Sequence, residues 1–251
     1  MPVLSLSLYL TSPLSLQVIL DHHNEEPHST HPTFEAYAQA LHDEVVTDRP
    51  DRATRPWILV SHSHGSTGAY GIGRLLGRRL RRFIVLGRRP PHVELLEDVF
   101  GVTTIEEIAN LSLHTVAQTI ATTYVNPAFA MGTADADESK WAEPFVQAAK
   151  IARDQYSSAC SMCGAAAIEA YFGNKPGTEL PPAVRLSAPI LAVVSSRETS
   201  RGETREKAAR WAELTTGACT VEAVDCEHMG LPTHDRAIKL VLDALEAKGR
   251  A

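Results

Sequence analysis

The sequence has few features that would place the chain in a membrane or on a polyanion. Its most apolar stretch, residues 1–20, is broken by Ser and Pro and runs into charge at Asp21, so it is too interrupted to span a bilayer. The stretch also lacks the positive start and small-residue cleavage site of a signal peptide. The net charge is −6, which disfavours a general affinity for nucleic acid. We therefore expect no nucleic-acid partner and no membrane association.

Cysteine is also scarce, with 4 residues in 251. Cys160 and Cys163 form a C-x-x-C within a small-residue stretch of helical character, while Cys219 and Cys226 lie near a predicted strand. Zinc would require these two pairs to meet in space, and free thiols in a reducing cytoplasm are the simpler interpretation. The histidine-rich segment 21–31 lacks a zinc-type spacing, so we interpret it as a polar loop. We expect a cytoplasmic protein with no metal.

The chain does contain strands and helices in alternation, with no internal repeat. Apolar runs predict strands over residues 4–10, 16–21, 57–61, 83–87, 190–195 and 219–224. Helical periodicity predicts helices over residues 34–47, 66–79, 204–215 and 233–248. The alternation predicts an α/β fold in which a mostly parallel central sheet is flanked by helices.

A strand runs into a sharp turn and a helix at PWILVSHSHGSTGAYGIG, residues 56–73, with Ser63 at the apex. This is the layout of a nucleophile elbow, in which the serine takes a strained backbone conformation and the residues two before and two after it must be small. Ser61 and Gly65 meet that condition, although Ser61 replaces the first glycine of G-x-S-x-G. A plain structural turn is the alternative interpretation of these residues alone.

An elbow serine needs an acid and a histidine, which follow it in that order in the hydrolases built on such a sheet. The predicted strand 190–195 is followed by a turn that contains Glu198, and the predicted strand 219–224 is followed by a turn that contains His228. Sites on open parallel sheets form beyond the carboxyl ends of the strands. The order and placement therefore predict Ser63 as nucleophile, Glu198 as acid and His228 as base.

Four stretches of the sequence resemble the stand-alone type II thioesterases of polyketide and nonribosomal peptide pathways, which have the α/β-hydrolase fold. They are the elbow LVSHSHGS, the strand and turn LRRFIVLGRRPPH, the segment APILAVVSSRE, and the ending ARWAELTTGACTVEAVDCEHMGL. They resemble, in order, the family's G-H-S-M-G, S-G-R-R-A-P, P-V-x-A-L-x-G-x-x-D, and W-x-x-x-T-x-G followed by G-G-H-F-x-L. The resemblance covers residues 16–98 and 187–245, and it implies the roles given above for Ser63, Glu198 and His228.

The acid departs from the family pattern, because Glu198 stands where the family mostly has Asp. The side chain is one methylene longer but can still accept the imidazole N–H. Related synthase-embedded thioesterases take their acid from the turn after the preceding strand, here residues 87–91, and this turn contains none. Asp225 and Glu227 are rivals beside His228, but they would have to fold back to meet its ring.

The residues expected to form the oxyanion hole depart further from the family pattern. The family has an N-terminal P-x-A-G-G loop whose backbone N–H supplies half of the hole, and no such loop exists in this sequence. The resemblance leaves the N–H of His64 as one donor, with Thr11 or Ser12 as candidates for the other. Loss of one donor typically costs about 10²- to 10³-fold in rate, so the alternatives are a slow hydrolase, a repurposed member, or a chain whose true start was lost.

His62 and His64 flank the predicted nucleophile. His64 stands where the family has Met, so it is a candidate extra acid or base, as is His62, which matches the family's usual histidine. For both residues the alternative is a structural role, His64 lining the pocket and His62 supporting the turn.

Between the predicted core segments, residues 1–92 and 181–251, about ninety residues lose the strand pattern and become helical. We predict a helical lid insertion over residues 93–180. Its apolar residues are candidates to line an acyl channel, or are ordinary core: Leu111, Val116, Ile120, Tyr124, Phe129, Met131, Trp141, Phe145 and Tyr156.

Arginines are concentrated after the elbow, at positions 74, 78, 79, 81, 82, 88 and 89. The resemblance implies an acyl carrier protein or synthase module as partner, with the substrate held on its phosphopantetheine and no cofactor bound to the enzyme. The arginine run would then dock an acidic carrier, or it is simply a solvated helix end.

These observations predict a serine thioesterase that releases acyl chains from a carrier protein in natural-product, antibiotic or fatty-acid biosynthesis. Two alternatives remain at this stage. One is a thioesterase-like cyclase or remodelling enzyme, suggested by the missing loop and the two flanking histidines. The other is a catalytically inactive hydrolase-fold protein that binds a partner.

Overall fold

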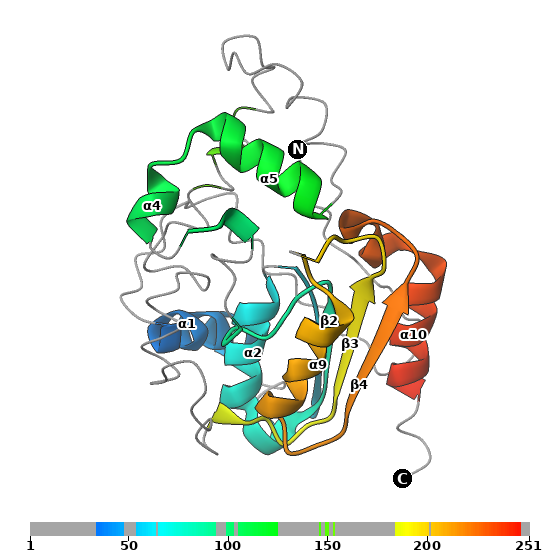
Figure 1. The fold of residues 1–251 in the computed structure, drawn as a ribbon. Helices are drawn as coiled ribbons and strands as arrows, with labels where there is room; N and C mark the ends of the chain where they lie inside the picture. Colours follow the sequence, from blue (N-terminus) through cyan, green and yellow to red (C-terminus); the bar gives the residue numbers. More distant parts are fainter. Residues whose placement is uncertain are drawn as a thin grey trace.

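The computed structural model describes residues 34–47, 54–63, 65–93, 99–102, 105–124, 184–200 and 202–246, with single positions at 146, 149, 150 and 153 (Figure 1). Within these residues the sheet has four strands in the order β1-β2-β3-β4, and each pairs with its neighbour in parallel. The strands are β1 (Trp57–His62), β2 (Leu80–Leu86), β3 (Ile190–Ser195) and β4 (Cys219–Val224). All their carboxyl ends therefore meet at one edge.

The strand sequences explain this sheet. β3 reads ILAVVS and is buried at every position, as expected of a parallel strand covered on both faces. The predicted bounds of β3 and β4 are confirmed, β1 is one residue longer than predicted, and β2 begins three residues earlier, at Leu80. The strands predicted over residues 4–10 and 16–21 lie outside the described residues.

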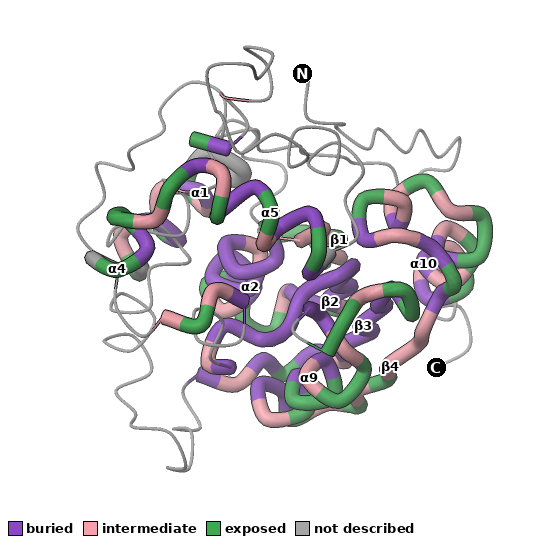
Figure 2. The backbone as a smooth tube through the Cα atoms, turned by 45° about the horizontal axis from the view of Figure 1, so that its top comes forward, coloured by how far each residue is buried: buried purple, intermediate pink, exposed green. Residues whose placement is uncertain are grey.

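Two layers of helices bury the two faces of the sheet (Figure 2). On one face pack α1 (Phe34–Thr47), α2 (Gly65–Leu76), α9 (Arg205–Ala209) and the 3₁₀ helix η5 (Arg210–Leu214). Trp211 anchors this face, fully buried and edge-on to Phe83 with ring centroids 5.4 Å apart. The other face is covered by α10 (Asp235–Glu246) and the 3₁₀ helix η6 (His228–Thr233).

The ends of the helices can be explained by glycine, capping and proline residues at their boundaries. α1 has its predicted bounds, while α2 gives way after Leu76 to the 3₁₀ turn η2 (Gly77–Arg79), where Gly77 has a φ of 53°. The helix predicted over 204–215 is capped by the Thr204 side chain, which accepts from the Lys207 N–H, and it changes to 3₁₀ geometry at Arg210. α10 begins two residues later than predicted, because η6, which contains Pro232, precedes it.

Two helices lie beyond the carboxyl edge of the sheet: α4 (Ile105–Ala109) and α5 (Leu113–Tyr124) (Figure 1). They form a small core in which Val99, Ile108, Val116 and Ile120 are buried, with Leu111 packed against them. Of the candidate channel residues, these three therefore serve as core: Leu111, Val116 and Ile120. The side chains of the others, and most of the predicted lid over 93–180, lie outside the described residues. None of the described helices is long and apolar enough to cross a membrane.

Candidate active site

The predicted elbow is present at the carboxyl end of β1. Ser63 has a φ of 51°, and it is the only non-glycine residue with a positive φ among those described. Its N–H donates to the Leu86 carbonyl at 2.8 Å, which ties the turn to β2, and its carbonyl accepts from the Ser66 N–H at 3.0 Å as α2 begins. A left-handed serine held by such contacts is a strained residue of the kind that clusters at active sites.

The small-residue requirement of the elbow is met in an unexpected way. Ser61 fits at the position of the missing glycine because its hydroxyl donates to the Ile84 carbonyl at 3.2 Å. A Cβ atom on Gly65 would meet nothing within 4 Å, since this residue lies at the exposed start of α2. The described residues therefore do not by themselves explain why position 65 is a glycine.

Ser63, His228 and Glu198 come together from three different strand ends. His228 Nε2 lies 2.9 Å from Ser63 Oγ, and His228 Nδ1 lies 2.8 Å from Glu198 Oε1. Because a carboxylate oxygen accepts, Nδ1 carries the ring proton and Nε2 is left to accept from the serine hydroxyl. This is the nucleophile, base and acid arrangement in which the histidine can take the serine proton.

The acid is deeply buried, and its rivals do not take its place. The side chains of Glu198 and His228 are 1% and 5% exposed. Asp225 instead pairs with Arg197 at 2.8 Å, and its own side chain is 78% exposed. Both ring nitrogens of His228 are already occupied by Ser63 and Glu198, so neither Asp225 nor Glu227 is needed as the acid.

Gly87 is a site residue that the sequence analysis did not identify. It directly follows β2 and has a φ of 62°, and a Cβ atom there would lie 3.0 Å from His228 Cε1, 3.1 Å from Nδ1 and 2.9 Å from Leu231 Cδ1. The backbone of residue 87 therefore passes directly against the imidazole. A glycine is required both for the positive φ and for this close approach, and the G-R-R motif was the available signal.

His62 occupies a supporting position. Its Nε2–H donates to the backbone carbonyl of His228 at 3.2 Å, and the two imidazole rings are 5.2 Å apart. Burial, followed by the charge of His228, lowers the pKa of His62 to about 3. A ring that stays neutral at neutral pH and donates to a carbonyl holds the base in place, so this geometry favours the structural role over an extra acid or base.

The predicted oxyanion donors lie outside the described residues: His64, Thr11 and Ser12. What the structure describes is α2, whose first turn begins just after Ser63. The positive end of a helix dipole and its free N–H groups favour negative charge at that position. This orientation suits a tetrahedral oxyanion next to Ser63.

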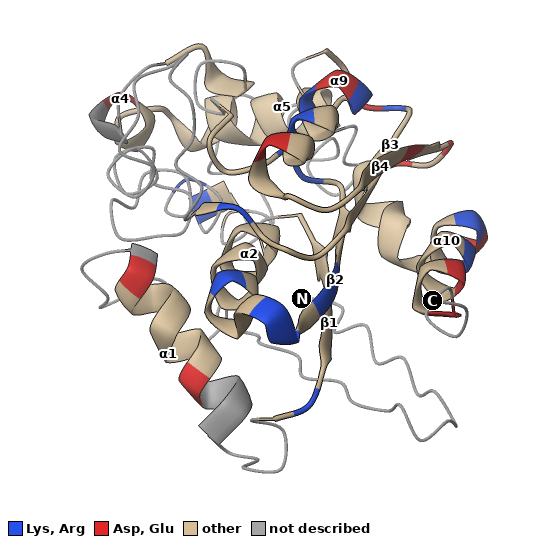
Figure 3. Cartoon of the chain, turned by 90° about the horizontal axis from the view of Figure 1, so that it is seen from below, with Lys and Arg blue, Asp and Glu red and all other residues tan. Residues whose placement is uncertain are grey.

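The arginine run does not form one docking surface. Arg88 and Arg89 are 3% and 1% exposed, and both pair with Glu203 in the interior. The other arginines lie along the end of α2 and the start of β2, the end of the sheet opposite Ser63 (Figure 3). The seven residues of β2 span roughly 20 Å. Arg88 and Arg89 therefore cannot belong to a surface that docks a carrier, and for the other arginines of the run both predicted interpretations, a dock and a solvated helix end, stay open.

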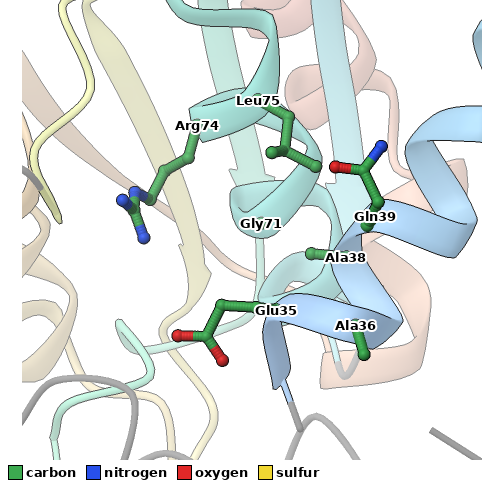
Figure 4. A pocket seen from close by; sticks show the side chains of 7 residues that line it. All are labelled: Glu35, Ala36, Ala38, Gln39, Gly71, Arg74 and Leu75. Atoms are coloured by element: carbon green, nitrogen blue, oxygen red, sulfur yellow. The ribbon is translucent and has the colours of Figure 1, made fainter.

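No metal-type cluster of His, Cys, Asp or Glu occurs among the described residues. Cys219 and Cys226 are free thiols whose pKa values are raised by burial, while Cys160 and Cys163 are not described. A pocket of about 370 Å³ lies between α1 and α2, away from the three site residues (Figure 4). Its lining includes Glu35, Arg74 and Leu75.

The parallel sheet, its elbow and its two helical layers define the α/β-hydrolase fold, and comparison with solved structures supports this. The RedJ thioesterase of the prodiginine pathway in Streptomyces coelicolor is 21% identical, with a TM-score of 0.53 over 86% of this chain and 71% of that chain. YbtT, the type II thioesterase of the yersiniabactin pathway, is 15% identical, with a TM-score of 0.54 over 85% and 74%. The predicted fold class is confirmed. No family profile and no curated protein sequence matches the chain.

Proposed function

We propose that this protein is a serine thioesterase that hydrolyses acyl thioesters held on the phosphopantetheine of a carrier protein. The observation that carries the proposal is the unbroken hydrogen-bonded path from Ser63 Oγ through the His228 ring to the buried Glu198 carboxylate. The likeness of the fold to RedJ and YbtT, described as thioesterases of natural-product pathways, supports a thioester as substrate. By the same likeness, the pathway is the synthesis of a polyketide or nonribosomal peptide.

The chemistry proceeds through an acyl-enzyme. His228 Nε2 removes the Ser63 proton as Oγ attacks the thioester carbonyl, and the carbonyl π electrons move to oxygen. When the tetrahedral intermediate collapses, the C–S bond breaks and the thiolate takes the proton from Nε2. Water then repeats the sequence at the acyl ester and releases a carboxylic acid. Glu198 stabilises the imidazolium at both stages without taking its proton.

Oxyanion stabilisation falls to the backbone N–H after the nucleophile, that of His64, together with the start of α2. The proposal needs no metal or redox cofactor for either half-reaction. The proposed partner is the carrier protein, and the proposed location of the reaction is the cytoplasm. The carrier must deliver the thioester to the carboxyl edge of the sheet, where the three site residues meet.

The test is intact-mass analysis of the protein after incubation with a serine-reactive phosphonate and, separately, with a panel of acyl thioesters. We expect a single adduct and turnover in the wild type, and neither in Ser63→Ala. A linear acid as product distinguishes hydrolysis from cyclisation, which would release a ring. Absence of both adduct and turnover in folded wild-type protein would leave a binding role in place of catalysis.

A further inference from the structure

A second buried carboxylate lies next to the predicted acid. The segment after β3 turns back on itself, with the Gly202 N–H donating to the Thr199 carbonyl at 2.9 Å. The backbone N–H of Glu203 then donates to Glu198 Oε2. One oxygen of the Glu198 carboxylate thus faces His228 and the other is held by the chain five residues on.

The close approach of this turn is possible because residue 202 is a glycine. A Cβ atom there would lie 2.5 Å from Glu198 Oε2 and 3.1 Å from the carbonyl oxygen of Thr123 in α5. The Glu198 carboxylate is held by His228 and by the Glu203 N–H, and the Thr123 oxygen belongs to the backbone of a helix, so both neighbours are fixed. The turn can therefore pack against the Glu198 carboxylate only because residue 202 has no side chain.

The turn is fixed by the side chain of Glu203, which is 0% exposed. Its Oε2 accepts from the backbone N–H of Arg89 at 2.6 Å and from Arg89 Nε at 3.1 Å. Arg89 Nη2 also donates to the Gly202 carbonyl at 2.8 Å. Arg89 therefore holds two consecutive residues of the turn with two separate guanidinium nitrogens, a geometry that lysine cannot reproduce.

The pairing of the buried charges also supports a fixed position of this turn. Arg88 Nη1 lies 3.6 Å from Glu203 Oε1, so two buried guanidinium groups surround one buried carboxylate. The Glu198 side chain, 1% exposed, contributes the second carboxylate of this region. A buried charge is costly unless it is paired, and these groups offset one another.

We propose that Glu203, anchored by Arg89, is a positioning residue that fixes the Glu198 carboxylate against His228. This rests on the proposed function, in which Glu198 orients and stabilises the base. Glu203 touches neither substrate nor Ser63, and it acts through its backbone N–H, whose place its own buried side chain determines. The turn after β2, which carries Arg88 and Arg89, thereby supports the acid that follows β3.

The test compares three variants of the full chain. Glu203→Gln removes the charge that Arg89 holds, and Arg89→Lys keeps every charge while losing the fork. Glu213→Gln is the matched control, because Glu213 is a 42% exposed carboxylate ten residues on, 2.8 Å from Arg210, and glutamine can keep the 2.9 Å hydrogen bond to His92. Each is measured for kcat, KM, the pH profile of kcat/KM and the rate of phosphonate labelling, with folding checked by near-ultraviolet circular dichroism.

We expect Glu203→Gln and Arg89→Lys to lower kcat and the labelling rate by about 10- to 100-fold with little change in KM, the range typical of residues that orient a catalytic group. The acid limb of the pH profile should move to lower pH in both, because a displaced Glu198 stabilises the imidazolium less. Glu213→Gln should match the wild type. Folded variants with wild-type kcat and pH profile would overturn the proposal, as would loss of the native fold in both, which would assign the cluster to stability alone.

A readout independent of turnover separates this inference from the proposed function. The proton shared by His228 Nδ1 and Glu198 should give a downfield nuclear magnetic resonance line in the wild type, whether or not the enzyme accepts any thioester. The line should shift or broaden in Arg89→Lys and persist in Glu213→Gln. A wild type with the line but no activity contradicts the proposed function only, whereas an unchanged line in Arg89→Lys contradicts the positioning role.

Discussion

Two carboxylates follow neighbouring strands at the same edge of the sheet, and they differ in burial and in the residue that each contacts. Glu198, after β3, is 1% exposed and contacts His228, although 30 residues separate the two. Asp225, after β4, stands three residues from His228, yet it is 78% exposed and pairs with Arg197, which holds the pKa of Asp225 below its ordinary range. Closeness in sequence does not decide which carboxylate contacts the imidazole. What decides it is a turn that buries the carboxylate and aims it at the ring.

The difference between Glu198 and Asp225 is tested most strongly by neutralising each carboxylate in turn. Glu198→Gln leaves His228 without a partner that fixes its tautomer, and we expect kcat to fall by about 10³- to 10⁴-fold. Asp225→Asn, which makes the same chemical change in solvent, should leave kcat/KM close to the wild-type value. Steady-state hydrolysis of one thioester measures both. Equal losses in the two variants would show that the comparison is false.

A shorter acid tests the fit of the turn. Glu198→Asp keeps the charge but withdraws the carboxylate by one methylene, so it cannot reach His228 Nδ1 and the Glu203 N–H together. A misplacement of this size costs about 10²-fold in rate. We expect kcat to fall by that factor while phosphonate labelling still maps to Ser63. Full activity in Glu198→Asp would show that the turn adapts to the shorter side chain and that its shape does not determine the acid.

The two glycines with positive φ on either side of β2 form a matched pair. Gly87→Ala places a methyl group 3.0 Å from the His228 ring, whereas Gly77→Ala meets open space, at φ values of 62° and 53°. Both variants should lose about 1 kcal/mol of stability because alanine is strained at a positive φ, and Gly87→Ala should lose more because its methyl group also collides with His228 and Leu231. Only Gly87→Ala should lose activity, by about 10-fold or more, since a shift of the base disturbs its alignment. Urea unfolding and kcat together separate strain from collision.

The last comparison concerns His62, which donates to the backbone carbonyl of His228 and whose expected effect is on stability alone. Its pKa falls from 6.5 to about 3 on folding, so the unfolded chain takes up a proton that the folded chain does not. Its contribution to stability is present above about pH 6.5 and is lost progressively as the pH falls toward 3. Between pH 7 and pH 5 the loss amounts to about 2 kcal/mol. Urea unfolding at both values should show a weaker pH dependence in His62→Asn, and an unchanged dependence would contradict this assignment.

The core strands, the elbow and the meeting of Ser63, Glu198 and His228 could be predicted because each has a local signature. β3 and β4 are apolar runs bounded by turns, and Ser63 lies between a strand and a small-residue helix start. Glu203, Gly202 and Arg89 could not be predicted, because their roles depend on the register of a turn against another strand end. The arginine run could not be interpreted from the sequence for the same reason. The sequence alone does not show that Arg88 and Arg89 lie in the interior while Arg78 and Arg81 lie at the far end of the sheet.

The Gly202 turn also constrains how this sequence can change over time. Because the turn leaves 2.5 Å between a would-be Cβ at position 202 and the Glu198 carboxylate, the length of the acid and the size of residue 202 are coupled. A change of Glu198 to the shorter aspartate would have to be accompanied by a remodelled turn, and under the proposed function either change made first would pass through a poorly active intermediate. Substitutions at positions 198 and 202 should therefore be strongly epistatic, so that lineages retain the glutamate and the glycine together or replace both.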